Sequence, residues 1–214
     1  FNTAVGDRAG ENVTTGIQNT LIGGLAGDAL TVGSTNVALG VSALGADTKG
    51  NSSVAIGSSA LRLQNFTTAT DAYNVAIGRA AGENVTTGIQ NTIVGGLAGD
   101  ALTDADYNVA MGASALSADT LGSRSTALGT SALAAQNFTT ATNSDNTAVG
   151  AFTGDAITTG IDNTLIGAFA GSALTDADHN VAIGRAALAS DTLGSKSVAI
   201  GREALVTQNF TTAT

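Results

Sequence analysis

The chain has 214 residues, a formal net charge of −9, and neither Cys nor Pro. The absence of Cys excludes disulfides and thiolate metal sites, and the eight scattered Lys and Arg residues argue against a nucleic-acid partner, which requires a basic stripe. With 28 Gly, 43% hydrophobic residues and only 4% aromatic residues, the composition predicts a core of small aliphatic side chains.

One short phrase recurs twelve times: Asn or Ser, a β-branched residue, Ala or a larger aliphatic residue, an aliphatic residue or Met, and Gly. Successive phrases are 17, 17, 17 and 21 residues apart, and this order then begins again. Such a period predicts a solenoid, in which each coil buries its apolar face by stacking on its neighbours. We number the coils 1 to 12 by their phrases, which begin at Asn2, Asn19, Asn36, Ser53, Asn74, Asn91, Asn108, Ser125, Asn146, Asn163, Asn180 and Ser197.

The phrase itself predicts a short β-strand. In coil 5, Val75 and Ile77 alternate with Ala76 and Gly78, and a period of two is typical of a strand. The second position is always Thr or Val, and the fourth is always Val, Ile, Leu or Met, which are residues that favour strands. We therefore expect an all-β parallel β-solenoid, or β-roll, of twelve stacked coils, with the second and fourth side chains pointing into the coil.

The other positions of the coil predict corners and ladders. The Gly that ends each phrase indicates a corner with positive φ, or a seam that permits contact between chains, or both. Three residues later Ala occurs in eleven coils, followed by Gly or Leu in the order Gly, Gly, Leu, Leu, which we interpret as a second short strand. The leading Asn, as in Asn74, Asn91 and Asn108, is expected to hydrogen-bond to its stacked neighbours. The structural glycines are Gly6, Gly23, Gly40, Gly57, Gly78, Gly95, Gly112, Gly129, Gly150, Gly167, Gly184 and Gly201.

Four coils form a larger unit. We expect one solenoid over residues 1–214, built of three super-repeats, 1–72, 73–144 and 145–214, and cut from a longer chain. The fourth coil of each carries four extra residues and the segment Gln-Asn-Phe-Thr-Thr-Ala-Thr, which is expected to project as a ledge every ~19 Å along a rod of ~57 Å. Its Phe residues are interpreted as covers of exposed coil edges or as contacts to a ligand or a neighbouring chain; they are Phe66, Phe138 and Phe210.

The phrases Asn-Val-Ala-Ile-Gly (74–78 and 180–184) and Ser-Val-Ala-Ile-Gly (53–57 and 197–201), with the Ala-Leu that follows several of them, resemble a known family. They are similar to the head repeats of trimeric autotransporter adhesins, and also to repeats of phage tail fibres and bacterial surface fibre proteins. The resemblance spans all twelve coils. It implies a left-handed parallel β-roll, a side-by-side homotrimer, an extracellular location on a bacterial cell or virion, and a role in attachment.

Catalytic and metal-binding patterns are weak. The single His, His179, corresponds to Tyr107 and Thr35 in the other super-repeats, so it is interpreted as a solvated turn residue, and no enzyme activity or cofactor is expected. Closely spaced carboxylates form a weak Ca²⁺ candidate, although the first super-repeat lacks them. These candidates are Asp104, Asp106, Asp176 and Asp178.

Two functions compete most closely. The first is an extracellular structural and adhesive fibre segment that presents a repetitive surface to a host cell, matrix or other surface, with a host receptor or glycan as partner. The alternative is a self-assembling architectural filament or sheath subunit, because uncapped coil stacks expose pairing edges. Ice binding and polysaccharide cleavage are weaker alternatives, and no segment is apolar enough to predict membrane insertion.

Overall fold

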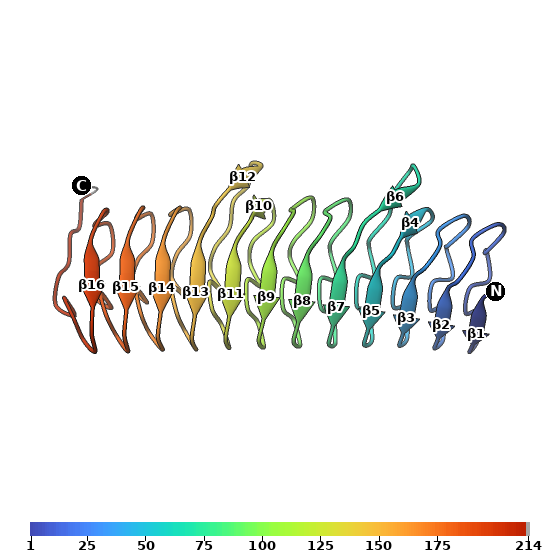
Figure 1. Ribbon diagram of the computed structural model, residues 1–214, viewed down its shortest axis with the longest axis horizontal. Coiled ribbons are helices and arrows are strands. Elements are labelled where there is room, and N and C mark those ends of the chain that lie inside the picture. Colours follow the sequence, from blue (N-terminus) through green and yellow to red (C-terminus); the bar gives the residue numbers. More distant parts are fainter. Residues whose placement is uncertain (213–214) are drawn as a thin grey trace.

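The computed structural model describes residues 1–212 as a row of stacked coils, with the two ends of the chain at opposite ends of the row (Figure 1). Every coil contributes one three-residue strand to a single parallel sheet of twelve strands. The prediction of a parallel β-solenoid is confirmed. The strands of this long sheet are β1 (Thr3–Val5), β2 (Thr20–Ile22), β3 (Val37–Leu39), β5 (Val54–Ile56), β7 (Val75–Ile77), β8 (Thr92–Val94), β9 (Val109–Met111), β11 (Thr126–Leu128), β13 (Thr147–Val149), β14 (Thr164–Ile166), β15 (Val181–Ile183) and β16 (Val198–Ile200).

The coil spacing fixes the register of this sheet. Each strand pairs with the equivalent positions of the next phrase, so that Ala76 lies beside Ile93 after a 17-residue coil and Ala55 lies beside Ala76 after a 21-residue coil. The four extra residues therefore leave the ladder undisturbed. They must be accommodated elsewhere in the coil.

The expected direction of the strand side chains was wrong. The third position points into the coil: Ala76 and Ala110 are fully buried, and so is Ile93. The second and fourth positions point outward, and Ile77 is 38% exposed. Period-two alternation shows which residues share a face but not which face lies inside. The interior of the coil is so narrow that the majority of the third positions hold the small residue Ala.

The Gly, Gly, Leu, Leu order reflects a compensation of side-chain volume in the core. In coil 6 the third position is the large Ile93, and the glycines on either side of it, Gly82 and Gly99, lie where an added Cβ would meet its Cδ1 at 2.9 and 3.4 Å. In coils 3 and 4 the third position is Ala, and Leu44 and Leu61 fill the space instead. The second short strand expected here is absent from the described residues, in which these positions form turns.

The glycine at the end of each phrase forms the predicted corner. All twelve have φ between 126° and 140°, a range that side chains rarely adopt. At Gly40 an added Cβ would lie 2.6 Å from the carbonyl oxygen of Gly57 in the next coil. The close approach that the small residue permits is therefore an approach between coils of one chain.

The leading Asn residues form the predicted ladder, mainly through the backbone. The Asn91 Oδ1 atom accepts a hydrogen bond from the Asn108 N–H at 2.9 Å, and Asn91 Nδ2 donates to the Ala105 carbonyl at 2.7 Å. The same two bonds recur at the other Asn residues of the series, whereas direct bonds between side-chain amides occur at only some steps, such as Asn91 to Asn74 at 3.3 Å. Each Asn thus ties together neighbouring coils.

The 21-residue coils project beyond the regular outline, as predicted for the ledges. In the first super-repeat β4 (Gly50–Asn51) pairs with β6 (Thr70–Asp71), and in the second β10 (Gly122–Ser123) pairs with β12 (Thr142–Asn143). Both pairs stand out on the same side of the stack (Figure 1). In the third super-repeat the corresponding segment lies at the end of the described chain.

Candidate functional site

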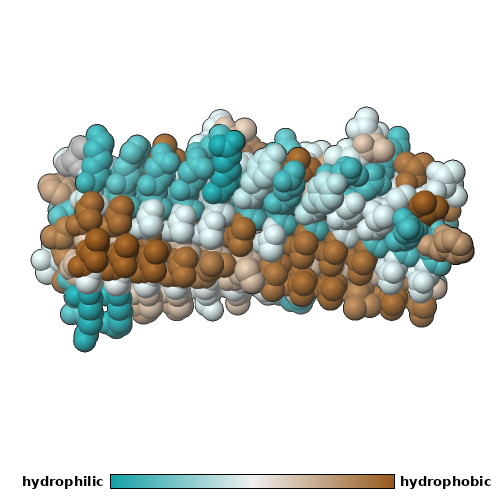
Figure 2. Space-filling view, in the orientation of Figure 1, coloured by the Kyte–Doolittle hydropathy of each residue, from teal (hydrophilic) through white to brown (hydrophobic). Residues whose placement is uncertain are grey.

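The outward face of the long sheet carries an extended apolar surface. Its two exposed rows consist of Thr and Val at the second position and of Val, Ile, Leu or Met at the fourth, with no charged residue in either row. In the middle of the sheet Leu39, Ile77, Met111 and Ile166 remain 38–41% exposed. Figure 2 shows the result as a hydrophobic band that runs along the long axis of the molecule, across the strands, and is interrupted by paler segments.

This band is large enough to hold another chain. Twelve strands at a spacing of ~4.8 Å and three residues at ~3.3 Å give a footprint of about 570 Å² on each copy. Two such faces in contact would cover about 1,100 Å², which is just below the roughly 1,200–2,000 Å² of specific, stable interfaces and above the about 1,000 Å² expected of a biological interface. A footprint of about 570 Å² is at the upper end of the roughly 300–600 Å² of the largest apolar patch on a typical monomer, and such patches are often functional.

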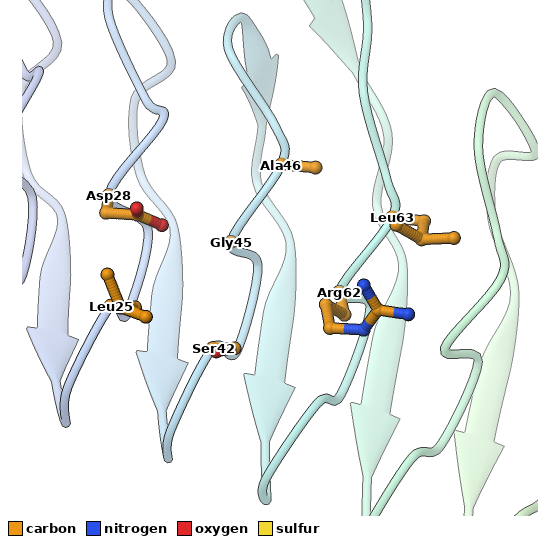
Figure 3. A pocket seen from close by; sticks show the side chains of 7 residues that line it. All are labelled: Leu25, Asp28, Ser42, Gly45, Ala46, Arg62 and Leu63. Carbon is orange, nitrogen blue, oxygen red and sulfur yellow. The ribbon is translucent and has the colours of Figure 1, made fainter.

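A shallow groove lies on the opposite side of the coil from the strands, with a volume of about 260 Å³. It opens where Gly45 stands between Asp28 and Arg62 in successive coils, so that a missing side chain leaves a notch (Figure 3). The Arg62 Nε atom donates to Glu83 Oε1 at 2.8 Å, and its guanidinium group is therefore occupied within the chain. In the second super-repeat Ser117 and Ala134 replace Gly45 and Arg62, so the groove does not recur.

The weak Ca²⁺ candidates are used in contacts between coils. Asp104 Oδ1 accepts a hydrogen bond from the Thr87 hydroxyl at 2.7 Å, and Asp106 Oδ1 accepts one from the Ile89 N–H at 2.8 Å. Asp176 and Asp178 accept the equivalent bonds from the Thr159 hydroxyl at 2.7 Å and from the Ile161 N–H at 2.8 Å. Within residues 1–212 no three acidic or His side chains cluster as a metal site would require.

The three Phe residues of the ledges differ in exposure. Phe66 and Phe138 are only 5% and 6% exposed, which agrees with the interpretation that they cover coil edges. Phe210, in the last described coil, is 44% exposed. The third super-repeat has two further exposed Phe residues, Phe152 and Phe169, whose rings stack with their centroids 5.4 Å apart.

A buried polar network at the fourth coil was missed by the sequence analysis. Gln64 Nε2 donates to Asp47 Oδ2 at 2.6 Å and to Ser53 Oγ at 3.0 Å, while Gln64 Oε1 accepts from Asn74 Nδ2 at 2.9 Å. Asp47 also accepts from the Gly50 N–H at 2.9 Å. The sequence carries a signal of this network, because the phrase begins with Ser instead of Asn only in coils 4, 8 and 12, and these coils carry Gln64, Gln136 and Gln208.

Two carboxyl groups are less well satisfied. Burial raises the pKa of Asp100 and of Asp155, and in both residues it outweighs a backbone hydrogen bond that acts in the opposite direction. The Oδ1 atom of each has no hydrogen-bond partner. The two residues lie at equivalent places five residues after a corner Gly but in different coils, so they do not form a pair that could serve acid–base catalysis.

The single His is a turn residue, as expected. His179 has a φ of 60° and a half-exposed side chain, with Nε2 3.9 Å from Asp162 Oδ2. Among residues 1–212 there is also no helix that is long and apolar enough to cross a membrane.

The comparisons with known proteins return nothing that identifies the chain: no protein-family model matches it, and no curated protein or solved structure is significantly similar to it.

Proposed function

We propose that this chain is a segment of an extracellular fibre with a structural and adhesive role, in which copies associate side by side through the outward face of the long sheet. The observation that carries the proposal is the outward face of the twelve strands, which has no charged side chain and is apolar at the fourth position of every phrase. A soluble protein with a net charge of −9 gains most from covering this face. A homotrimer around a common axis, as the resemblance to adhesin heads implies, would cover it on every copy.

The adhesive part of the proposal depends on repetition. Ledges separated by one super-repeat would present the same exposed Thr-rich loop, such as Thr67 and Thr68, several times along a stiff rod. Weak sites at fixed spacing bind with avidity if their partner on a host surface is also repeated. The ledges project away from the coil outline and so remain accessible when the sheet faces are covered.

The association of copies is tested by sedimentation with a matched pair of variants. Ile77→Lys places a charge on the apolar band, whereas Val32→Lys places it on another wall of the coil, and both side chains are 38% exposed. We expect wild type and Val32→Lys to sediment at the same multiple of 20.8 kDa, and Ile77→Lys to dissociate. A monomeric wild type, or an Ile77→Lys variant of unchanged mass, would contradict the proposed contact.

The second candidate is a self-assembling architectural filament without a specific ligand, and the uncharged outward face of the sheet favours it, because copies that associate through this face need no other partner. Beads coated with the protein distinguish the two candidates when they are exposed to glycan arrays and to immobilised matrix proteins. Retention that is lost when the ledge residues Thr67 and Thr68 are changed to Ala supports adhesion. Assembled material that is retained on no surface leaves the filament as the function.

A further inference from the structure

One column of side chains at the surface differs in chemical character from one super-repeat to the next. It consists of the residue that directly precedes the leading Asn or Ser of each phrase. In the second super-repeat the column holds two Tyr residues, an amide and a guanidinium group, and we call these four residues the tyrosine track: Tyr73, Gln90, Tyr107 and Arg124. The other members of the column are Phe1, Gln18, Thr35 and Ser52 in the first super-repeat and Asp145, Asp162, His179 and Lys196 in the third.

The two Tyr residues of the track are both strained and exposed. Tyr73 and Tyr107 have φ values of 51° and 60°, in the left-handed region that disfavours bulky side chains. They are 55% and 48% exposed, so burial within the chain does little to offset this strain. Asp145 and Thr35 occupy the equivalent places in other super-repeats, and the fold therefore requires no aromatic ring there. Strain of this kind is concentrated at functional sites, and it points to a partner for the two rings.

Backbone hydrogen bonds hold the track at a regular spacing. The Gln90 N–H donates to the Ala72 carbonyl of the preceding coil at 2.7 Å. The Tyr107 N–H donates to the Ile89 carbonyl at 3.1 Å, which is the equivalent bond one coil further along. Because adjacent strands are ~4.8 Å apart, the two Tyr residues lie ~10 Å apart along the stack, with Gln90 midway between them.

The track extends from one ledge to the next and ends at an unpaired cation. Tyr73 comes two residues after β6 of the first ledge, and Arg124 directly follows β10 of the second. Arg124 is exposed and makes no ion pair with an acidic side chain among residues 1–212. In a chain where acidic residues outnumber Lys and Arg by 17 to 8, its guanidinium group is thus available to an anion of a partner.

These groups together match an extended chain of sugars. The C–H faces of pyranose rings are apolar and pack on aromatic side chains, while sugar hydroxyl groups bind amides such as that of Gln90. A sugar in an extended chain advances by about the length of one coil step, ~4.8 Å, so the first and third of four consecutive sugars would lie on Tyr73 and Tyr107. The fourth would meet Arg124, which pairs best with a carboxylate. The net charge of −9 disfavours a ligand that is charged at every sugar.

We propose that the tyrosine track binds a linear oligosaccharide that carries a single carboxylate at the end nearest Arg124. This inference rests on the adhesive part of the proposed function, and it places the glycan on coils 5 to 8 rather than on the Thr-rich loops of the ledges. The other two super-repeats lack the pair of Tyr residues, so each chain of 214 residues offers one such site.

The test is calorimetric titration of the wild-type protein with two probes. One is a β-linked tetrasaccharide of alternating galactose and N-acetylglucosamine, and the other is the same chain capped by sialic acid, whose carboxylate is its only charge. We expect the capped probe to bind at one site per chain and several-fold more tightly than the uncapped probe. Heparin, a polyanion, should not bind.

Single substitutions assign the contacts. Tyr107→Ala should weaken the binding of both probes about 2- to 12-fold, as expected for the loss of one aromatic contact, and Tyr107→Phe should restore it. Arg124→Gln should remove the preference for the capped probe. Gln90→Ala should weaken binding, whereas Gln18→Ala should not, and this control lies in a segment of identical sequence, because residues 10–20 repeat as 82–92. Circular dichroism checks that the variants keep the sheet.

The outcomes separate this inference from the side-by-side association of copies. A wild-type protein that binds neither probe would overturn the glycan site, and so would a Tyr107→Ala variant of unchanged affinity. Dissociation of Tyr107→Ala in sedimentation would also overturn it, because the ring would then belong to the contact between copies. A monomeric wild type that binds the capped probe would support the glycan site and contradict only the side-by-side contact.

Discussion

The corner glycines provide the sharpest test of how the coils stack. Gly40 has a φ of 140°, and a Cβ there would lie 2.6 Å from the Gly57 carbonyl oxygen of the next coil. Because the obstacle is backbone, no side-chain rotation can remove the clash. Gly40→Ala must therefore either strain the corner or push coils 3 and 4 apart.

The expected cost follows from two contributions. A side chain held at such a φ costs about 1–3 kcal/mol. Separation of coils 3 and 4 weakens the bonds from Gly57 N–H to the Leu39 carbonyl and from Ser59 N–H to the Val41 carbonyl, 2.8 and 2.9 Å, at about 0.5–1.5 kcal/mol each. We expect a total loss of about 2–6 kcal/mol from the free energy of unfolding.

Gly24→Ala is the matched control in the neighbouring coil. An added Cβ at Gly24 meets nothing within 4 Å, and this residue has no positive φ. Its replacement should leave stability unchanged or raise it by about 0.4–1 kcal/mol, since Ala restricts the unfolded chain. Urea denaturation followed by circular dichroism measures both variants, and hydrogen exchange locates the change. Equal effects of the two substitutions would refute the reasoning.

Three further predictions concern the core, the ladder and a partly buried carboxyl group. Ile93→Ala should lower the free energy of unfolding, measured by urea denaturation, by about 2–5 kcal/mol, and Ile77→Ala should lower it much less, because only Ile93 lies inside the coil. Similar losses for the two variants would indicate that the fourth position also lies in the core. Asn91→Ala should lower the free energy of unfolding by about 2–5 kcal/mol, because it leaves a buried N–H and a buried carbonyl without partners. A loss smaller than that of the exposed control Asn137→Ala would contradict the role of the Asn ladder. Burial raises the pKa of Asp100, so the folded chain binds the proton more tightly and loses stability as pH rises through that pKa. Asp100→Asn should therefore stabilise the chain at pH 7 by less than about 1 kcal/mol, given screening of this partly exposed group, and should give no gain near pH 3 in parallel urea titrations.

The repeat spacing was sufficient to predict the number of coils, the strand in each coil and the in-register parallel pairing. It could not decide which face of the strand lies inside. That decision depends on volume, because Ala at the third position and Leu or Ile at a few places together fill a narrow coil. The size compensation between Ile93 and its flanking glycines carried this information, but it becomes readable only when residues from adjacent coils are known to touch.

The same error affected the apolar band, because its residues, at the second and fourth positions, were expected to lie in the core. The polar network around Gln64 was missed for a related reason: its four members come from three coils and meet only after stacking. The ledges were predicted correctly, because four additional residues in a fixed outline have to project. Lateral association, adhesion and an extracellular location remain proposals that depend on the band and the ledges.

The proposed side-by-side assembly depends most on what the outward face of the long sheet touches. A cryo-electron microscopy reconstruction of the assembled protein shows this in cross-section. We expect several copies with their sheets turned toward a common axis, strands crosswise to the long dimension, and ledges pointing outward. A single solenoid with its sheet exposed to solvent, or copies joined through the ledges, would contradict the account.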